Sequence, residues 1–340
     1  MNNSNVISSA AIGIDLGGTN LRVGIVDPEG KILKSLKRPT LANEGKEKVI
    51  TRIIDLLKEA LEISNQLSRQ VCGICIGAPG FLDLKKGIIR ESPNLPDWKD
   101  VAITKEIEKR TNFPTVLLQN DATVFTYGEW LTGAGKTYDS IVGVTLGTGV
   151  GGGIILNRKI WPGENGMAGE IGHMVVEPSG LKCQCGRDGC LESYASGTGI
   201  VKRIITALKK GRNSSLSDGV EGDFRSITAR MVFEEAMAGD ELSIDIMEEA
   251  GTYLGIAVAT LINVLDVGRF VVGGRVAGAG DLILEPARQE IMKRAIKTPA
   301  KDKVLVKADL GDDAGIIGAA GIVFQGSSSS EKMTFAFLPR

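Results

Sequence analysis

The chain has 340 residues, of which 43% are hydrophobic and 24% charged, proportions typical of a globular protein long enough to fold around more than one core. Its 40 Lys and Arg residues nearly balance 41 Asp and Glu residues, which gives a net charge of −1. This balance argues against a protein that binds nucleic acid or an anionic membrane through a basic surface.

The first residues, MNNSNVISSAAIGIDLGG, lack the basic region and the following apolar region of a secretory signal. No continuous apolar run of about 20 residues is present, so we expect no transmembrane helix. The cysteine count is odd, at 5, and no export signal precedes the cysteines. We therefore expect a cytoplasmic protein, in which clustered cysteines bind metals or catalyse reactions more often than they form disulfides.

Two glycine-rich segments, residues 12–27 and 142–157, match each other when the sequence is shifted by 130 positions. They read IGIDLGGTNLRVGIVD and VGVTLGTGVGGGIILN, and each predicts a strand, a Gly/Thr turn and a second strand. The repeat indicates two related lobes. Such turns either need glycine for a positive φ or let backbone N–H groups approach phosphate oxygens. Two copies, one with Asp15 at its mouth, favour a polyphosphate clamp in which Asp15 handles Mg²⁺ directly or through water.

The segments between and after these hairpins alternate between helical and strand patterns, which predicts an α/β protein. Helices are expected over residues 46–63, 199–209, 229–236, 250–265 and 282–296, and strands over residues 71–76, 116–118 and 270–272. Residues 211–222 are rich in Ser, Asn, Asp and Gly, and predict a mobile loop. Residues 326–330 predict a low-complexity linker into a tail over 327–340, for which the sequence offers no function.

Asn120 and Asp121 follow the short strand expected over residues 116–118. Asn and Asp commonly cap helices or form turns, so this pair has a purely structural interpretation. The functional interpretation makes Asp121 a general base for a hydroxyl group and Asn120 a hydrogen-bond partner of the same substrate. The residues alone favour neither interpretation.

Two other patterns imitate functional motifs. Gly147, Gly149 and Gly152 satisfy the spacing of a dinucleotide-binding loop, but a strand pattern follows them where that site requires a helix. We therefore reject a dinucleotide site. Cys72 and Cys75 have the spacing of a redox pair, but their apolar surroundings predict two buried core thiols.

A cluster of three cysteines follows the single histidine of the chain, in the pattern His173-x9-Cys183-x-Cys185-x4-Cys190. One imidazole and three thiolates in a polar segment predict a closed tetrahedral Zn²⁺ site of structural type. The second ring nitrogen of His173 would then be available to another partner. Glu170 and Glu192 flank the cluster and, together with His173, are suited to bind a polyol, although solvated loop charges are the simpler interpretation.

These segments together resemble the ROK (repressor, open reading frame, kinase) family, in its glucokinase branch, from residue 12 to about residue 323. The stretches that carry the resemblance are IDLGGTNLRVGIVD, GAPGFLD, SPNLPDW, LQNDATVFTYGEW, AGEIGHMVV, CQCGRDGCLESYASGTGI and VVGGRVA. The resemblance implies two duplicated ribonuclease-H-like α/β lobes of the actin/hexokinase type, with an ATP/sugar cleft between them. It implies a smaller lobe of residues 1–120 plus about 312–326, a larger lobe of residues 121–311 with the zinc motif, and a tail of residues 327–340.

The resemblance also implies ATP-dependent phosphorylation of the primary 6-hydroxyl of a hexose, with glucose favoured. Asp121 would be the catalytic base, and the sugar ligands would be Asn94, Asn120, Asp121, Glu170, His173 and Glu192. The nucleotide and its phosphates would lie against Asp15, Gly17, Gly18, Thr19, Thr145, Gly147, Thr148, Gly273 and Gly274. The implied cofactors are ATP, Mg²⁺ and a structural Zn²⁺, and the implied assembly is a homodimer.

Two alternatives come with the same family. An N-acetylhexosamine kinase (for N-acetylglucosamine or N-acetylmannosamine) would share these motifs and differ in the space around the C2 position of the sugar. The other alternative is a non-catalytic sugar-sensing regulator, which the presence of Asp121 and of both phosphate hairpins disfavours. The transcriptional repressors of the family carry a DNA-binding helix-turn-helix before the sugar-binding lobes. The first strand is expected by about residue 10, so we do not expect that element, nor a nucleic-acid partner.

Overall fold

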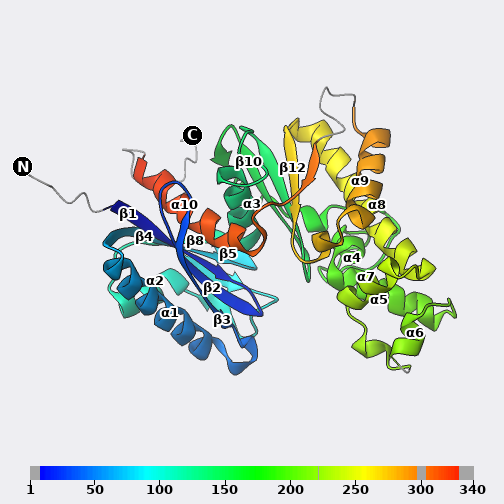
Figure 1. Cartoon of the computed structure of the whole chain (residues 1–340), viewed down its shortest axis with the longest axis horizontal. Coiled ribbons are helices and arrows are strands. Elements are labelled where there is room, and N and C mark those ends of the chain that lie inside the picture. The colour runs from blue at the N-terminus through cyan, green and yellow to red at the C-terminus, as the bar shows by residue number, and fades with distance from the viewer. Residues whose placement is uncertain (1–7, 221, 297–303, 329–340) are drawn as a thin grey trace, which may run out of the picture.

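The computed structural model describes residues 8–220, 222–296 and 304–328. Its frame consists of two five-stranded sheets set side by side, with helices between them and on their outer faces (Figure 1). The first sheet has the strand order β3-β2-β1-β4-β8. Its strands are β1 (Ser8–Leu16), β2 (Asn20–Val26), β3 (Ile32–Pro39), β4 (Arg69–Ala78) and β8 (Val116–Asn120).

The second sheet has the order β11-β10-β9-β12-β13. Its strands are β9 (Ile141–Leu146), β10 (Val150–Leu156), β11 (Lys159–Ile160), β12 (Arg269–Gly273) and β13 (Leu305–Lys307). In each sheet the three strands that come first in sequence pair antiparallel. A fourth strand then pairs in parallel with the first, and a fifth pairs in parallel with the fourth. The duplicated architecture expected from the 130-residue repeat is therefore confirmed.

The two hairpin tips have the same length, and each is closed by a hydrogen bond from its first glycine, although the acceptor positions differ. The first tip, Gly17–Thr19, and the second, Gly147–Gly149, each join two antiparallel strands through three residues. Gly17 N donates to Asn20 O at 2.9 Å, and Gly147 N donates to Gly149 O at 2.9 Å. Neither Gly17 nor Gly147 has a positive φ, so backbone conformation alone does not require glycine at these positions.

Helices cover the outer faces of both sheets (Figure 1). α1 (Lys46–Gln66) and α2 (Ile103–Thr111) pack on the first sheet, and α1 buries the apolar face that its periodicity predicts. The second sheet carries α4 (Glu192–Ala195), α5 (Gly197–Lys209), α6 (Leu216–Gly219), α7 (Ala229–Met237), α8 (Glu241–Leu265) and α9 (Asp281–Arg294) on its side of the molecule. A small sheet of β5 (Phe81–Asp83), β6 (Ile88–Glu91) and β7 (Lys99–Val101) projects from the first sheet.

Two further helices, α3 (Asp121–Leu131) and α10 (Ala314–Ser328), lie between the two sheets and share a core with strands of both. They approach closely because glycines face the partner helix. A Cβ on Gly128 would lie 2.1 Å from Ala314 O, and one on Gly318 would lie 1.8 Å from Val124 O. This contact brings the C-terminal part of the chain against the first sheet. The lobe boundaries at residues 120 and 312 remain predictions.

Three sequence expectations need correction. Residues 211–222 contain the short helix α6, and Ser214 and Ser215 donate hydrogen bonds to Asp240, so most of this segment is anchored rather than a free loop. The helix expected from residue 250 begins at Glu241, after the N-cap Asp240. α10 continues to Ser328, through the start of the predicted linker, while residues 329–340 of the tail lie outside the described part.

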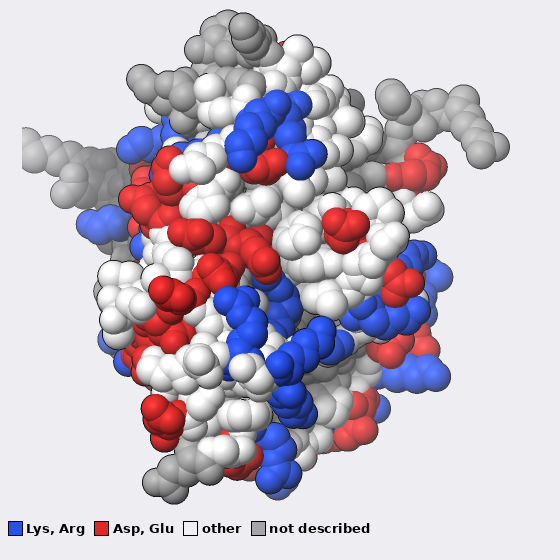
Figure 2. Space-filling view, turned by 90° about the vertical axis from the view of Figure 1, so that its right-hand side faces the viewer, with Lys and Arg blue, Asp and Glu red and all other residues white. Residues whose placement is uncertain are grey.

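The prediction for the two N-terminal cysteines is half correct, since Cys75 is buried whereas Cys72 is exposed. On the face shown in Figure 2, acidic side chains gather to the left of the middle, and basic side chains lie beside them, from the lower middle toward the right-hand edge. Among the described helices, none is both long enough and apolar enough to span a membrane.

Candidate active site

The pair Asn120–Asp121 lies where the edge strand β8 runs into α3. Asn120 is the N-cap, and its Oδ1 accepts a hydrogen bond from Thr123 N at 3.1 Å. Asp121 Oδ1 accepts from Ala122 N at 2.8 Å. Capping therefore uses one oxygen of each side chain, and the Asn120 side chain also hydrogen-bonds the Asp121 carboxyl group. The structural and functional interpretations of this pair are compatible.

The Asp121 carboxyl is partly buried, and removal from water is the main cause that raises its pKa. The negative charge of Glu170 raises this pKa further, while hydrogen bonds from the backbone lower it. A carboxylate that is a stronger base than usual, at the N-terminus of a helix, is suited to accept a proton from a hydroxyl group.

Asp15, near the end of β1, faces the same region. Burial is the main cause that raises its pKa to about 7, and the charge of Asp121 adds to the effect. A Cβ on Gly315 would lie 3.0 Å from Asp15 Cγ, so the first turn of α10 packs directly against this carboxyl group. Two nearby carboxyl groups with raised pKa values form a site that a cation would stabilise.

Arg22 pairs with Asp15 in the β1–β2 register and lowers the pKa of that carboxyl group. Its guanidinium also donates to Asp313 at 2.5 Å, just before α10, and to Asp312 O. The sequence analysis did not identify Arg22. The hairpin register was the available signal, because a turn between Leu16 and Leu21 places Arg22 opposite Asp15.

The second hairpin tip has room for a ligand at a glycine. A Cβ on Gly147 would meet nothing nearer than Gly149 O at 4.0 Å, and Gly147 does not have a positive φ. Neither packing nor backbone geometry in the protein explains a glycine here. Open space beside the backbone is a feature that phosphate-binding turns share.

Gly273 ends β12 beside this second hairpin, and Gly274 follows it. Gly273 pairs with Thr145 in the parallel ladder. Gly274 has a φ of 86°, and a Cβ there would lie 2.4 Å from Leu146 O. The chain therefore needs glycine at 274 to turn past the end of β9. This places the predicted adenosine-side motif next to the second predicted phosphate turn.

The predicted metal ligands converge, since one ligand atom from each of His173, Cys183, Cys185 and Cys190 lies within 4.8 Å of the others. Cys185 Sγ and Cys190 Sγ are 3.7 Å apart. Two Zn–S bonds of about 2.3 Å at the tetrahedral angle would place the sulfurs about 3.8 Å apart. The thiols therefore fit Zn²⁺ and are too far apart for a disulfide bond.

The two ends of the thiol cluster differ in their surroundings. A hydrogen bond from the Arg187 backbone is the main cause that lowers the pKa of Cys185 to about 7. Burial raises the pKa of Cys190 to about 12. A cation is thus needed to hold all three sulfurs as thiolates near neutral pH, which is what a bound Zn²⁺ does.

His173 lies between the cysteine cluster and Glu170. Its Nδ1 lies 3.9 Å from Cys183 Sγ, and its Nε2 lies 3.9 Å from Glu170 Oε2. A metal held by Nδ1 would fix the ring so that Nε2–H points toward Glu170 and any ligand beside it. The role of His173 and Glu170 in binding a sugar stays a prediction.

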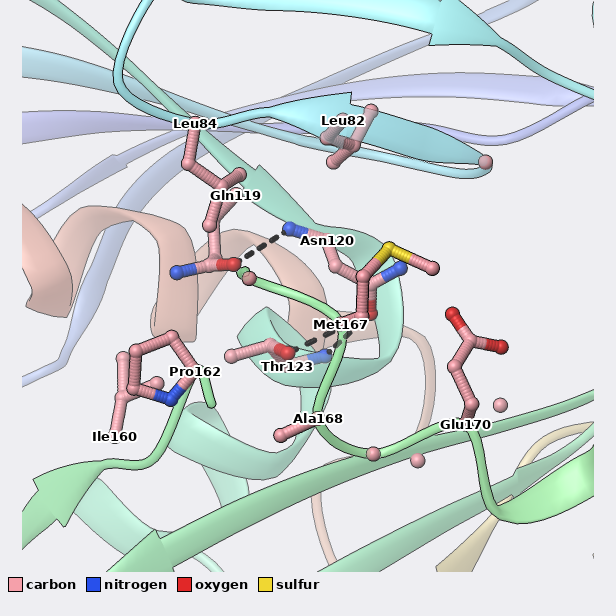
Figure 3. Close-up of a pocket in the computed structure, with 15 residues that line it drawn as sticks. Leu82, Leu84, Gln119, Asn120, Thr123, Ile160, Pro162, Met167, Ala168 and Glu170 are labelled. Carbon is pink, nitrogen blue, oxygen red and sulfur yellow. Dashed lines mark hydrogen bonds between the residues drawn. The ribbon is translucent and has the colours of Figure 1, made fainter. Parts of the chain in front are cut away.

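Glu170 and Asn120 border a small cavity of about 50 Å³, which Gln119, Thr123 and Met167 also line (Figure 3). Gln119 Oε1 accepts from Asn120 N at 2.8 Å and helps to hold the strand end in place. This volume holds water but not a hexose, because ligand pockets usually measure about 300–1,000 Å³.

The remaining predicted residues lie at the hairpin tips. Asn94 packs against the first tip, where a Cβ on Gly18 would lie 3.0 Å from Asn94 O. Glu192 begins α4 and accepts a hydrogen bond from Val150 N at 2.9 Å, next to the second tip. The two tips belong to different sheets. Among the described residues, no backbone hydrogen bond joins Gly17–Thr19 to Gly147–Gly149.

Replacing Cys185 by Ser is expected to abolish stoichiometric zinc binding and to weaken sugar affinity, because His173 loses its fixed orientation. Zinc content by atomic emission and sugar affinity by calorimetry test this. The matched control is Cys72→Ser, which changes an exposed thiol outside the cluster. A Cys185→Ser protein with one zinc per chain would contradict the tetrahedral assignment.

Comparison with known proteins identifies the family of the chain. The model of the ROK family matches residues 11–325. A glucokinase of Thermotoga maritima is 40% identical over 92% of this chain and 96% of its own length. The crystal structure of a ROK family glucokinase from Streptomyces griseus, in complex with glucose and AMPPNP, is 34% identical, with a TM-score of 0.78 over 94% of this chain and 100% of that chain. A ROK family transcriptional regulator, a homologue of the E. coli MLC protein, is 26% identical, with a TM-score of 0.81 over 94% of this chain and 79% of that one. The chain belongs to the ROK family.

Proposed function

We propose that the chain is an ATP-dependent hexose kinase that phosphorylates the 6-hydroxyl of glucose. The observation that carries this proposal is the convergence of Asp121 with Glu170 and His173 on one side and with Asp15 on the other. A base, a set of polar groups for a polyol and a carboxylate for a phosphate-bound cation are the parts that phosphoryl transfer to a sugar requires. The glucokinase relatives supply the substrate class.

In this proposal Asp121 accepts the proton of the sugar hydroxyl through its second carboxylate oxygen. The sugar oxygen forms a bond to the γ-phosphorus of ATP as the bond to the β–γ bridging oxygen breaks, and ADP leaves. Asn94, Asn120, Glu170, His173 and Glu192 hold and orient the sugar. The rate gain comes mainly from alignment and from matched charge, since the protein itself forms no covalent bond.

The phosphates are assigned to the two hairpin tips, with Gly17, Gly18 and Thr19 on one side and Thr145, Gly147 and Thr148 on the other. Gly273 and Gly274 belong to the adenosine side. Mg²⁺, when bound, would neutralise phosphate charge, and Asp15 is the carboxylate that would hold it directly or through water. Zn²⁺ on His173, Cys183, Cys185 and Cys190 would leave no open coordination position, which assigns it a structural role.

A coupled assay of ADP release with ATP and Mg²⁺ tests the proposal across glucose, mannose, fructose, N-acetylglucosamine and N-acetylmannosamine. We expect glucose to give the highest kcat/KM. Fastest turnover of an N-acetyl sugar would replace glucose and keep the catalytic assignments. No turnover on any of the five would overturn the kinase proposal and favour a sugar-sensing regulator of the kind represented in the same family.

We further propose a homodimer, which sedimentation equilibrium would test.

A further inference from the structure

A segment of nine residues, Cys190–Thr198, runs from the last thiol of the metal cluster to the first turn of α5. We call it the linking segment. Its start is anchored by Leu191 N, which donates to Met174 O at 2.9 Å next to His173. Its end is anchored by the N-cap Ser196, whose Oγ accepts from Gly199 N at 2.9 Å. The linking segment therefore connects the metal ligands to a regular helix without a flexible interruption.

Three hydrogen bonds attach the linking segment to the second hairpin tip. Gly197 N donates to Gly147 O at 2.8 Å. Thr198 Oγ1 donates to Thr148 O at 2.8 Å. Glu192 Oε2 accepts from Val150 N at 2.9 Å. The carbonyl groups of Gly147 and Thr148 are thus held toward the linking segment, which fixes the peptide planes of the tip.

Glu192 contacts the metal cluster and the hairpin with the same carboxylate. Its Oε1 lies 4.0 Å from Cys183 Sγ, while its Oε2 holds Val150 N. A Cβ on Gly149 would lie 2.4 Å from Glu192 Oε2, so glycine at that position allows the carboxylate to pack against the tip. A change in the position of the thiols would therefore be transmitted to the tip through one side chain.

The first hairpin tip has a different anchor and serves as an internal reference. Thr40 Oγ1 donates to Gly17 O at 2.6 Å, and Thr40 N donates to Thr19 O at 2.9 Å. Thr40 follows β3 in the same sheet. Both tips are held by their carbonyl oxygens, but the anchor of the second tip is continuous with the cysteine cluster.

We propose that the metal cluster positions the second phosphate turn as well as His173, with Glu192 and Thr198 as the positioning residues. Metal occupancy then sets the affinity for the phosphoryl donor in addition to that for the sugar. The nucleotide part of this inference rests on the proposed function. The structural part, that the metal cluster orders the tip, does not.

Hydrogen–deuterium exchange tests the structural part on the full chain, without substrates. Removal of zinc by a chelator, or the Cys185→Ser variant, is expected to speed amide exchange in residues 146–150 by about tenfold, the value of roughly one hydrogen bond. Exchange in residues 16–20, around the first tip, should change little. Equal changes at both tips, or none at the second, would overturn the proposal.

A second variant keeps the test valid if the zinc-free protein unfolds. Thr198→Val removes the hydroxyl donor to Thr148 O while the cysteine cluster stays intact. We expect faster exchange at residues 146–150 and a Kd for ADP, measured with Mg²⁺ and without sugar, that rises by about 3–10-fold. Thr198→Ser keeps the hydroxyl and should behave like the parent chain. A Thr198→Val protein that binds ADP and exchanges like the parent would refute the link.

The two variants together measure the coupling. If zinc acts on the tip through the linking segment, the effects of Cys185→Ser and Thr198→Val on ADP affinity will be less than additive. Strict additivity would contradict the proposal. Failure of the proposed function would look different, because the parent chain would then bind no ADP while the exchange pattern would still report on the link.

Discussion

Replacing Asp121 by Asn is expected to lower kcat by about 10²–10⁴-fold, the usual contribution of a general base. The fold should persist, because the asparagine amide oxygen can still accept the hydrogen bond from Ala122 N that Asp121 accepts at 2.8 Å. Sugar affinity should change little, since shape and size are nearly conserved. Steady-state kinetics with glucose, together with calorimetric sugar binding, measure the two effects separately.

The pH profile of the parent chain gives an independent check on Asp121. Because burial raises its pKa, kcat/KM should fall on the acidic side at a higher pH than an ordinary Asp would give. Glu170→Gln is the matched control, since the Glu170 charge contributes to raising that pKa. This variant should move the acidic limb to lower pH and raise KM for the sugar. A near-normal kcat for Asp121→Asn would remove Asp121 from the role of base.

The sequence was sufficient for the parts of the site that are encoded locally. The hairpins are predictable because glycine and threonine at fixed positions between apolar strands leave few other conformations. The cluster of His173, Cys183, Cys185 and Cys190 is predictable because its spacing is short and its ligands are chemically distinctive. Each hairpin and the metal cluster occupies fewer than about twenty consecutive residues, so none of them depends on how the two lobes pack.

Contacts between distant segments could not be predicted in this way. Arg22 and Asp313 are 291 positions apart and meet because α10 returns between the two sheets. Glu129 would be expected in solvent, yet its side chain is fully buried and accepts hydrogen bonds from Leu310 N at 2.8 Å and Ala134 N at 2.9 Å. These partners are backbone groups, whose positions depend on the whole fold rather than on residue type.

The length of α8 shows a similar limit. The apolar residues from Ala250 onward predict a buried helix, whereas the earlier turns, from Glu241, mix charged and apolar residues at helical spacing. Asp240 was a usable signal, since it caps the helix by accepting from Ser243 N at 2.8 Å. Gly239 before it and Ser243 after it suit a turn equally well, so residue type alone did not mark Asp240 as the start of a helix.

Replacing Asp15 by Asn is expected to stabilise the metal-free protein at pH 8 while it disables the kinase. The pKa of Asp15 is raised to about 7, from an ordinary value of 3.8, chiefly by burial and then by the charge of Asp121. Between these two pH values the folded chain holds a proton on Asp15 that the unfolded chain has released. Stability contributed by this group is therefore lost as pH rises from about 4 to 7.

An asparagine side chain does not ionise, so the Asp15→Asn variant should escape this loss. We expect its Tm in a chelating buffer to exceed that of the parent chain by about 2–6 °C at pH 8 and to match it near pH 4.5. Asp312→Asn is the matched control. The charge of Asp312 also raises the pKa of Asp15, but its side chain is 81% exposed, so this variant removes a surface charge and keeps the Asp15 carboxyl group.

The same substitution should lower kcat/KM for ATP by at least about 10²-fold, because the carboxylate that destabilises the empty site is the one assigned to the phosphate-bound cation. Stability and activity would then change in opposite directions at a single residue, which is typical of a site whose charges are arranged for a ligand. MgADP should raise the Tm of the parent chain at pH 8 more than that of the variant. If Asp15→Asn gains no stability at pH 8 relative to pH 4.5, the carboxyl is not held at a raised pKa and its assignment to the cation loses this support.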